Sequence, residues 1–363
     1  MYKVLHVIGR MDRGGAETFI MNVLRNIDRS KYEFDFLLSS PNGDYIEEIK
    51  SYGCNIFVIP ERNTGFIKYI KSLNNFFKCN IYDAVHMHVS SLTSIEALYF
   101  AKKHKIKNRI IHSHSTNQEG FLHKILHYFN KPIIKLVSTK FITCSKSAGE
   151  WLYSYTGINP NNVIHLNNGV IASRYLYNED VRFEYRKIFG IDNSTILLSH
   201  IGRFDENKNQ KFVVDVFKEY NLINPQSKLI FFGRGETENM VKKYVKDLNL
   251  EQNIIFAGVR PDIEKCLQAL DFLIFPSHYE GLPVTLIEAQ ASGLYILASD
   301  KVSSEANLSK CFSSLSLEES AYEWSKFIIN CEYPDRKEQN RYIIEKGYDI
   351  LSTIKVLEND IYI

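Results

Sequence analysis

The chain has 363 residues, of which 45% are hydrophobic and 24% are charged, and its net charge is +2. This length suits two globular domains better than one, and the modest charge and the lack of a nucleic-acid motif disfavour nucleic acid as a partner. No stretch approaches the roughly 18–20 uninterrupted apolar residues of a membrane-spanning helix, and the six cysteines form no CxxC pair, which disfavours a zinc site or a disulfide framework. We therefore expect a soluble cytoplasmic protein.

The first half of the chain alternates short apolar runs with segments of helical periodicity, such as residues 16–27 and 92–103. The runs are typical of strands, and the periodic segments are typical of helices. Strand–helix alternation predicts a parallel sheet that helices cover on both faces. The expected strands of this half are residues 4–8, 34–38, 56–59, 84–88, 109–112 and 140–144.

The second half repeats this organisation. After Asn168 and Gly169 the chain becomes polar and aromatic, with one amphipathic segment at 180–189, and then the alternation restarts. The expected strands are residues 195–201, 228–232, 253–257, 271–275 and 295–298. We therefore expect two Rossmann-like α/β domains, residues 1–175 and 176–345, and a C-terminal helix at 346–363 that packs back on the first domain.

Phosphate-binding groups follow two expected strands of the second half. The strand at 195–201 leads into Arg203 and then Lys208, which together suit a diphosphate because one offers a planar fork and the other a point charge. The strand at 228–232 leads into the glycine-rich turn 233–236. Open α/β sheets bind ligands at the carboxyl ends of their strands, so these residues predict a binding edge.

Two carboxylates lie beside a third strand end. Glu280 lies in the loop after the strand at 271–275, and Glu288 lies on a helix expected to run from Val284 to Ser292. The N-terminus of such a helix attracts phosphate, and carboxylates accept hydrogen bonds from ribose or sugar hydroxyls. An isolated pair of glutamates in such positions usually has no function beyond that of solvated surface side chains. Here, however, three strand ends of one sheet carry groups that could bind phosphate or hydroxyls.

The order and spacing of these residues resemble the retaining glycosyltransferases of family 4, which have the GT-B fold. The segment PSHYEGLPVTLIEAQASG at 276–293 carries the family's pair of glutamates separated by seven residues. The loop at 14–17 resembles the family's glycine-rich acceptor-side loop, and residues 167–170 resemble its interdomain segment. Leu282 and Pro283 depart from the Phe-Gly type that is common after the first glutamate and resemble capsular and exopolysaccharide transferases. The resemblance implies two Rossmann-like domains whose parallel sheets face each other across a cleft.

The resemblance also implies roles for individual residues. Arg203 and Lys208 would hold the donor diphosphate, Glu288 would bind the ribose, and Glu280 would contact the transferred sugar. Backbone groups near Gly281 would assist. The residues expected to bind the donor are Gly15, Arg203, Lys208, Gly233, Val259, Glu280, Gly281, Leu282 and Glu288, where Val259 contacts the base and Gly15 lets the N-terminal loop approach the phosphate. Those expected to be catalytic are His114, Glu280, Arg203 and Lys208.

The assignment of the histidine leaves an alternative open. The family places a histidine after a first-domain strand, near the transferred sugar, and here the strand at 109–111 leads into both His112 and His114. We favour His114 because it lies further past the strand end, and His112 remains the alternative. His86 and His88 are expected to line the same cleft without a catalytic role.

The expected reaction is transfer of a sugar, with retention, from a nucleotide-sugar donor that we expect to be UDP-linked to a saccharide or lipid-linked saccharide. No DxD motif is present, so no metal and no other cofactor is expected. A nucleotide-binding partner subunit without activity and a GT-B-fold sugar-nucleotide epimerase are the alternatives. A nicotinamide dehydrogenase is disfavoured because the first strand is not followed by GxGxxG.

The first half also carries a candidate membrane surface. Residues 1–170 hold an excess of about eight positive charges, whereas the remainder holds about six excess negative charges. Within the first half, residues 122–140 mix leucine and aromatic residues with Lys124, Lys131, Lys135 and Lys140. This pattern indicates a patch for anionic lipid, although ordinary solvated helix faces would give a similar pattern. We therefore expect a peripheral enzyme at the inner face of the plasma membrane.

Overall fold

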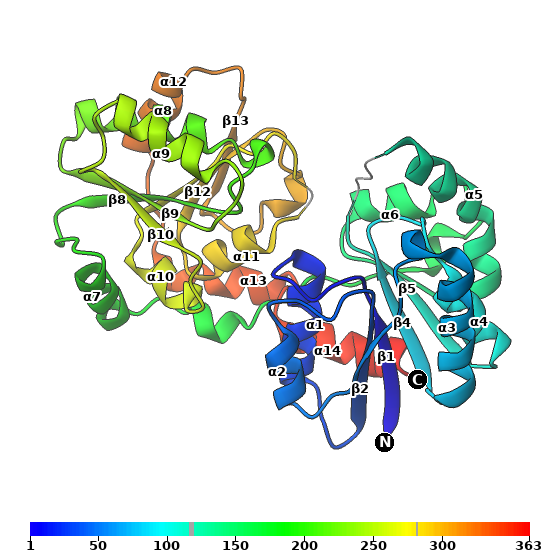
Figure 1. Cartoon of the computed structure of the whole chain (residues 1–363). Coiled ribbons are helices and arrows are strands. Elements are labelled where there is room, and N and C mark those ends of the chain that lie inside the picture. The colour runs from blue at the N-terminus through cyan, green and yellow to red at the C-terminus, as the bar shows by residue number, and fades with distance from the viewer. Residues whose placement is uncertain (116–119, 281) are drawn as a thin grey trace. The chain divides into compact units, whose positions relative to one another are not determined.

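The computed structural model describes residues 1–115, 120–280 and 282–363, and the chain divides into two compact units (Figure 1). Unit 1 comprises Met1–Gly169 together with Ile350–Ile363, and unit 2 comprises Val170–Asp349. Each unit holds one sheet of parallel strands between layers of helices, which confirms the α/β class predicted from the alternation. No helix in these ranges is both long and apolar enough to cross a membrane.

The sheet of unit 1 has the order β3-β2-β1-β4-β5-β6-β7, and all its pairs are parallel. Its strands are β1 Tyr2–Val7, β2 Tyr32–Leu38, β3 Ile56–Val58, β4 Ala84–Val89, β5 Asn108–Ser113, β6 Lys140–Thr143 and β7 Val163–His165. The longer helices are α1 Gly15–Asn26, α2 Ile46–Ser51, α3 Phe66–Cys79, α4 Glu96–Lys103, α5 Phe121–Val137, α6 Lys146–Tyr153 and α14 Ile350–Val356.

The two faces of this sheet differ in chemistry because strand side chains alternate between faces. One face is aliphatic and aromatic and packs into a core with α3, α4 and α5. The other face carries histidines of β1, β4 and β5 and His114 directly after β5, and the ring of Phe19 on α1 packs against His88, His112 and His114. The C-terminal helix α14 lies beside α1 on the same unit (Figure 1).

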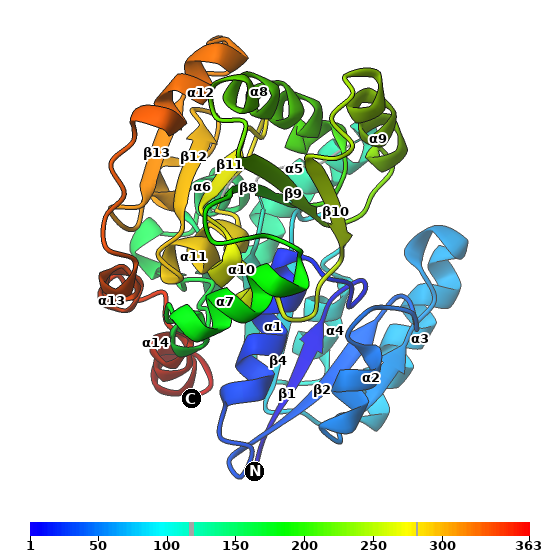
Figure 2. The ribbon, with the colours of Figure 1, turned by 90° about the vertical axis from the view of Figure 1, so that its left-hand side faces the viewer.

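The sheet of unit 2 has the order β10-β9-β8-β11-β12-β13. Its strands are β8 Ile196–Ile201, β9 Ser227–Phe232, β10 Ile254–Gly258, β11 Phe272–Phe275, β12 Tyr295–Ser299 and β13 Phe312–Leu315. Its helices are α7 Glu179–Ile188, α8 Gln210–Ile223, α9 Glu238–Asp247, α10 Ile263–Ala269, α11 Val284–Ala291, α12 Ala321–Asn330 and α13 Asn340–Glu345. Helices α8, α9 and α12 cover one face, and α7, α10 and α11 lie on the other (Figure 2).

Both sheets follow the same doubly wound plan. Counting from the first strand of each unit, the order begins 3-2-1-4-5-6 in both. The direction of winding therefore reverses between β1 and β4 in unit 1 and between β8 and β11 in unit 2. In open parallel sheets, the carboxyl ends of the strands at such a reversal form the ligand-binding crevice. The loops after these four strands are therefore the places to examine for a site.

Candidate functional site

In unit 2, the loops after β8 and β11 bring together a lysine and a glutamate predicted from the sequence. Lys208 and Glu280 form an ion pair, and each side chain is 17% exposed. Asn207 donates its amide hydrogens to Oε1 of Glu280 (3.1 Å) and to the backbone carbonyl of Tyr279 (2.9 Å). The Lys208 ammonium also lies 4.8 Å from the centre of the Phe275 ring. The lysine and the carboxylate are therefore held in fixed positions at the switch point.

The local sequence explains how the side chain of Lys208 is positioned. Asp205 caps the short turn Glu206–Lys208, because its Oδ1 accepts a hydrogen bond from the backbone N–H of Lys208 (3.0 Å). Asn209 then adopts a left-handed conformation, with φ of 54°, which asparagine tolerates better than most residues. Helix α8 begins directly afterwards, so the turn fixes the point at which Lys208 leaves the backbone.

Arg203 and Gly233 lie at the same edge of the sheet, where one offers an exposed charged side chain and the other a close backbone contact. Arg203 is exposed, and its backbone carbonyl accepts a hydrogen bond from the side chain of Gln210 (2.7 Å). Gly233 has φ of +131°, and a Cβ atom there would overlap the carbonyl oxygen of Gly202. The glycine is therefore required by the packing of neighbouring strand ends, whatever it does for a ligand. Val259 follows β10 at the same edge, with its side chain exposed.

Glu288 is held by a residue that the sequence did not single out. It is the fifth residue of α11, and Tyr175 donates its hydroxyl hydrogen to Oε1 of Glu288 at 2.7 Å. Burial raises the pKa of Glu288, and the hydrogen bond from Tyr175 opposes that rise. Leu282 is partly buried against the adjacent core, whereas Gly281 lies outside the described residues. Tyr175 gave no separate signal, because the whole segment after Gly169 is aromatic and polar.

The predicted residues of unit 1 lie on α1 and β5. Gly15 is the first residue of α1, and a Cβ atom there would meet open space. His114 follows β5 and is partly exposed, whereas His112 is fully buried within the strand. Of these two histidines, His114 is the one whose residue is partly exposed, and its role remains a prediction.

The histidines of unit 1 form a hydrogen-bonded layer on one face of the sheet. His88 bonds to His6 (3.0 Å) and to His114 (2.9 Å), and His86 bonds to His112 (3.2 Å). Burial lowers the pKa of His6 and of His114 to about 3, and it lowers the pKa of the other three well below the ordinary value. The nitrogens in this layer come within 4.8 Å of one another in two groups of three, but most of them already bond to a neighbouring ring. At neutral pH the layer is therefore uncharged.

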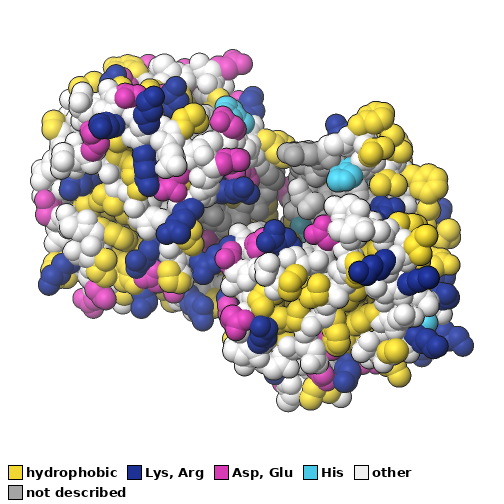
Figure 3. Space-filling model, viewed as in Figure 1, with side chains coloured by type: hydrophobic (Ala, Val, Ile, Leu, Met, Phe, Trp, Pro, Cys, Tyr) yellow, Lys and Arg dark blue, Asp and Glu magenta, His cyan; other side chains and the backbone are white. Residues whose placement is uncertain are grey.

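Helix α5 exposes a row of large apolar side chains, here called the α5 surface. Phe121 and Leu122, in its first turn, are 78% and 72% exposed, and Lys124 beside them is also exposed. Figure 3 shows hydrophobic side chains gathered over the part of unit 1 where Figure 1 places α5. The other members of the α5 surface are Ile125, Tyr128, Phe129 and Leu136.

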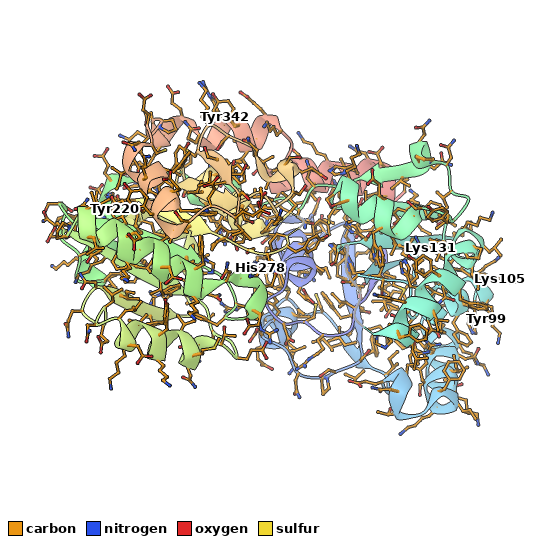
Figure 4. All side chains as sticks on the ribbon, turned by 90° about the horizontal axis from the view of Figure 1, so that it is seen from above. Tyr99, Lys105, Lys131, Tyr220, His278 and Tyr342 are labelled. Carbon is orange, nitrogen blue, oxygen red and sulfur yellow. The ribbon has the colours of Figure 1, made fainter. Side chains whose placement is uncertain are left out.

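Lys131 is not part of that surface, contrary to the sequence prediction. Its residue is only 3% exposed, and its ammonium donates to the backbone carbonyls of Trp151 (2.7 Å) and Ser154 (2.9 Å). It also lies over the Trp151 ring. Figure 4 shows Lys131 inward of Tyr99 and Lys105, which are exposed. Its carbonyl partners satisfy the ammonium, so Lys131 is a structural residue.

In unit 2, His278 lies in the loop after β11, where its side chain is exposed and its backbone N–H bonds to the carbonyl of Asn207 (2.8 Å) (Figure 4). Asn207, like Tyr175, was not predicted, although it directly precedes Lys208. Together these loop contacts give unit 2 a charged and hydrogen-bonding edge that can receive a phosphorylated and hydroxylated ligand.

Comparison with known proteins agrees with this geometry. Residues 13–174 match the family model described as Glycosyltransferase Family 4, and residues 181–311 match that of Glycosyl transferases group 1. EpsF of Bacillus subtilis (strain 168), named as a glycosyltransferase, is 30% identical over 369 residues, which cover 98% of this chain and 95% of EpsF. CapH of Staphylococcus aureus, named a capsular polysaccharide biosynthesis glycosyltransferase, is 31% identical over 345 residues, with 90% of each chain covered.

The fold has solved counterparts as well. The crystal structure of Anabaena HepE in complex with UDP and glucose superposes with a TM-score of 0.76 at 16% identity, and the match covers 99% of this chain and 98% of HepE. This likeness supports the GT-B arrangement of two Rossmann-like domains, and the identity to EpsF extends over nearly the whole chain. The protein is therefore a glycosyltransferase and belongs to family 4 of the GT-B fold.

Proposed function

We propose that this glycosyltransferase moves a sugar from a UDP-linked donor to a saccharide or lipid-linked saccharide acceptor in surface polysaccharide biosynthesis. The observation that carries the proposal is the cluster at the switch point of unit 2, where Lys208 and Glu280 meet in the loops that follow β8 and β11. Such an edge offers a cation to a diphosphate and a carboxylate to sugar hydroxyls. The UDP bound by HepE and the capsular role in the name of CapH support the choice of donor and pathway.

In this proposal each predicted residue has one task. Arg203 and Lys208 hold the diphosphate, Glu280 binds the transferred sugar, and Glu288 accepts hydrogen bonds from the ribose. Val259 contacts the base, while Gly233, Gly281 and Leu282 line the donor's path through backbone groups. Gly15 and His114 of unit 1 complete the set, with Gly15 near the phosphate and His114 near the transferred sugar.

The leaving diphosphate needs positive charge, and we propose that protein groups supply it without a metal. Arg203 is exposed and Lys208 is held in place, and the N-terminus of α11 adds its dipole. Activity should therefore persist in EDTA. Loss of activity in EDTA and its return with magnesium or manganese would contradict the metal-free mechanism.

We also propose that the sugar is transferred with retention and without a covalent sugar–enzyme intermediate. A nucleophilic carboxylate must be free to attack the anomeric carbon. Glu280 is held through its Oε1 by Lys208 and Asn207, and in this proposal it binds the hydroxyls of the sugar and does not attack it. NMR of the product at early times should give the anomeric configuration of the donor.

The most direct test of the donor is a thermal-shift screen of UDP, GDP, ADP and their sugars. A ligand at one hundred times its dissociation constant stabilises a protein by about 2.7 kcal/mol. We expect UDP-sugars to raise the melting temperature and Glu288→Ala to reduce the rise. An equal response to all three nucleotides, or an unchanged response in Glu288→Ala, would contradict the assignment.

A second part of the proposal concerns the acceptor side. We propose that the α5 surface docks on the anionic inner face of the plasma membrane, where a lipid-linked saccharide would be found. Phe121 and Leu122 offer apolar side chains for the interface, and Lys124 and Lys135 are exposed nearby. Insertion of these apolar side chains should give reversible membrane binding, together with about 1 kcal/mol of binding free energy from each lysine near the anionic surface.

Vesicle sedimentation tests this docking. The wild type should bind phosphatidylglycerol vesicles at low salt and less at high salt, and the double variant Phe121→Ser/Leu122→Ser should not bind. The matched control is Leu222→Ser/Ile223→Ser, an exposed apolar pair of unit 2, which should bind like the wild type. Wild-type protein that stays in solution at every salt concentration would show that the α5 surface is only a solvated face.

A further inference from the structure

The two charged side chains at the switch point of unit 2 are bonded to each other in the structure. Lys208 and Glu280 form an ion pair, and each side chain is 17% exposed. The proposed function, on which this inference rests, assigns the ammonium to the donor's diphosphate and the carboxylate to the transferred sugar. A carboxylate beside an ammonium cancels much of the positive charge that a diphosphate would meet. The ion pair and the donor therefore compete for Lys208.

Lys208 is the half of the pair that can change its partner. The turn Glu206–Lys208 fixes where its side chain leaves the backbone, but the ammonium is carried on a flexible aliphatic stem. An ammonium also bonds as a point charge, without the rigid fork geometry of a guanidinium. It can therefore turn from one anion to another while the backbone stays where it is.

Glu280 is the half of the pair that is held by other contacts. Its backbone carbonyl accepts a hydrogen bond from the N–H of Ser303 (3.1 Å), and its backbone forms a bridge with Val302 in the loop after β12. Its side chain accepts a hydrogen bond from the amide of Asn207 at Oε1 (3.1 Å). The carboxylate therefore keeps a partner when the lysine leaves.

Asn207 is suited to hold the carboxylate in this way. Its side-chain amide also donates to the carbonyl of Tyr279 (2.9 Å), and its backbone carbonyl accepts from the N–H of His278 (2.8 Å), which Figure 4 labels. The asparagine is thus tied to the loop that carries Glu280 by three hydrogen bonds. Because an amide is uncharged, it holds Glu280 without competing with Lys208 for a phosphate.

We infer that the donor's diphosphate draws Lys208 away from Glu280, and that Asn207 is a positioning residue that keeps the released carboxylate in place for the sugar. Recognition of the sugar is thereby coupled to recognition of the diphosphate. Part of the binding free energy of the diphosphate separates the ion pair, and Oε1 of Glu280 then becomes available to a sugar hydroxyl.

A double-mutant cycle with UDP, which has the diphosphate but no sugar, tests the separation of the pair. Calorimetric titration compares the wild type, Glu280→Gln, Lys208→Ala and the double variant. Glu280→Gln should bind UDP about fivefold more tightly than the wild type, because no ion pair has to be separated. In the Lys208→Ala background the same substitution should change the affinity by less than about twofold. An equal change in both backgrounds would overturn the inference, because it would reflect only repulsion between Glu280 and the diphosphate.

Glu206→Gln is the matched control for this cycle. It removes an exposed carboxylate from the same turn that carries Lys208. We expect its UDP affinity to stay within about twofold of the wild type, since exposed charges interact weakly through solvent. A control that tightens UDP binding as much as Glu280→Gln would show a general charge effect and would also overturn the inference.

Asn207→Ala tests the positioning role. The probe is the UDP-sugar that stabilises the wild type most in the thermal-shift screen. Loss of the amide should weaken binding of this UDP-sugar by about fivefold and change UDP affinity by less than about twofold, because only the sugar uses Glu280. The melting temperature without a ligand should stay close to that of the wild type. Equal losses of affinity for UDP and for the UDP-sugar would show a structural role and would overturn the positioning role.

Titration of the same cycle with GDP and ADP separates failure of this inference from failure of the proposed function. Exchange of the lysine requires a diphosphate but no particular base. Coupling between Lys208 and Glu280 that is equal for all three nucleotides, with equal affinities, would overturn only the choice of UDP. Binding of UDP without coupling would overturn the exchange alone, and binding of none of the three would overturn both.

Discussion

Glu288 has one carboxylate oxygen that is hydrogen-bonded within the protein. Tyr175, which is buried, donates to Oε1 at 2.7 Å, and Glu288 is partly buried. Burial raises the pKa of Glu288, and the hydrogen bond from the Tyr175 phenol opposes that rise because it stabilises the carboxylate form. A residue outside the predicted motif therefore contributes to the pKa of a residue inside it.

This pairing leads to a prediction for Tyr175→Phe. Loss of a hydrogen bond to a charged group should weaken UDP binding by about fivefold, or roughly 1 kcal/mol. The pKa of Glu288 should rise further, so binding should be lost on acidification at a higher pH than in the wild type. Calorimetric titration with UDP from pH 8 to pH 5 measures both effects.

Tyr185→Phe is the matched control, since Tyr185 makes the same kind of bond, at 2.7 Å, to Asp262. It should bind UDP like the wild type. A Tyr175→Phe variant with wild-type affinity and an unchanged pH profile would show that the phenol does not tune Glu288.

Lys208 offers a second prediction at this scale. Lys208→Ala removes the cation that pairs with Glu280 and should lower turnover by roughly 10²-fold, the usual loss for a group that stabilises leaving-group charge. Lys218→Ala, which removes an exposed lysine from α8, is the control for charge. Steady-state kinetics with a saturating donor measures the turnover of both variants. A Lys208→Ala variant as active as Lys218→Ala would refute the proposed role of Lys208.

Among the elements, β1, β4 and β5 have an unusual composition on one face. Alternation along the strands puts five histidines there, where aliphatic residues are usual, and the ring of Phe19 packs against three of them. Their mutual hydrogen bonds satisfy most of the ring nitrogens without any charge. The stability of this layer therefore depends on its remaining neutral.

We predict acid-sensitive unfolding from this layer. The pKa values of all five histidines are lowered by burial, so below about pH 6.5 the unfolded chain binds protons that the folded chain does not. The stabilisation is present above pH 6.5 and is lost as the pH falls towards 3, by up to about 1.4 kcal/mol per pH unit for each histidine. Urea unfolding at pH 7.5, 6.5 and 5.5 should show a steep decline, and a flat profile would contradict it.

The sequence predicted eleven strands and missed β7 and β13, for a physical reason. Both lie at sheet edges, β7 has three residues, and β13 includes Ser313 and Ser314. Edge strands need no long apolar run, because one side is unpaired and partly solvated. The buried strands stood out because parallel strands covered on both faces are continuously apolar.

The limits of a local sequence pattern also explain why the burial of Lys131 was not predicted. The sequence pattern of α5 indicates an apolar and basic helix but does not show where the helix meets the unit. Residues 121–125 are exposed all around, whereas from His127 onward one face is buried. Lys131 falls on that buried face and finds backbone carbonyls, which no local pattern could predict. The proximity of Lys208 and Glu280 was predictable because both follow the ends of neighbouring parallel strands.

At the scale of the molecule, unit 1 is built from two separate stretches of chain. Residues 350–363 contribute buried side chains and several hydrogen bonds to it. Asn108 donates to the carbonyl of Ile361 (2.6 Å), and Lys140 donates to the carbonyls of Asp360 (2.6 Å) and Ile361 (3.0 Å). Tyr362 adds its bond to His86. The histidine layer is therefore incomplete without the C-terminal segment.

Truncation after Asp349 should consequently destabilise unit 1 and spare unit 2. We predict that calorimetry loses the transition of unit 1, while UDP still raises the melting temperature of what remains folded. Removal of Ile363 alone, an exposed residue, is the control and should change little. A truncated chain that keeps every transition would show that the segment is dispensable.

The late position of residues 350–363 has a consequence during synthesis. A ribosome releases residues 1–169 first, then the whole of unit 2, and only then the segment that closes unit 1. Domains usually fold as they emerge from the ribosome. Here unit 1 begins to emerge first, but it cannot complete its fold until residues 350–363 have been synthesised. Until then His86 lacks the hydroxyl of Tyr362 and part of unit 1 stays uncovered, so nascent chains stalled before Ile350 should bind chaperones.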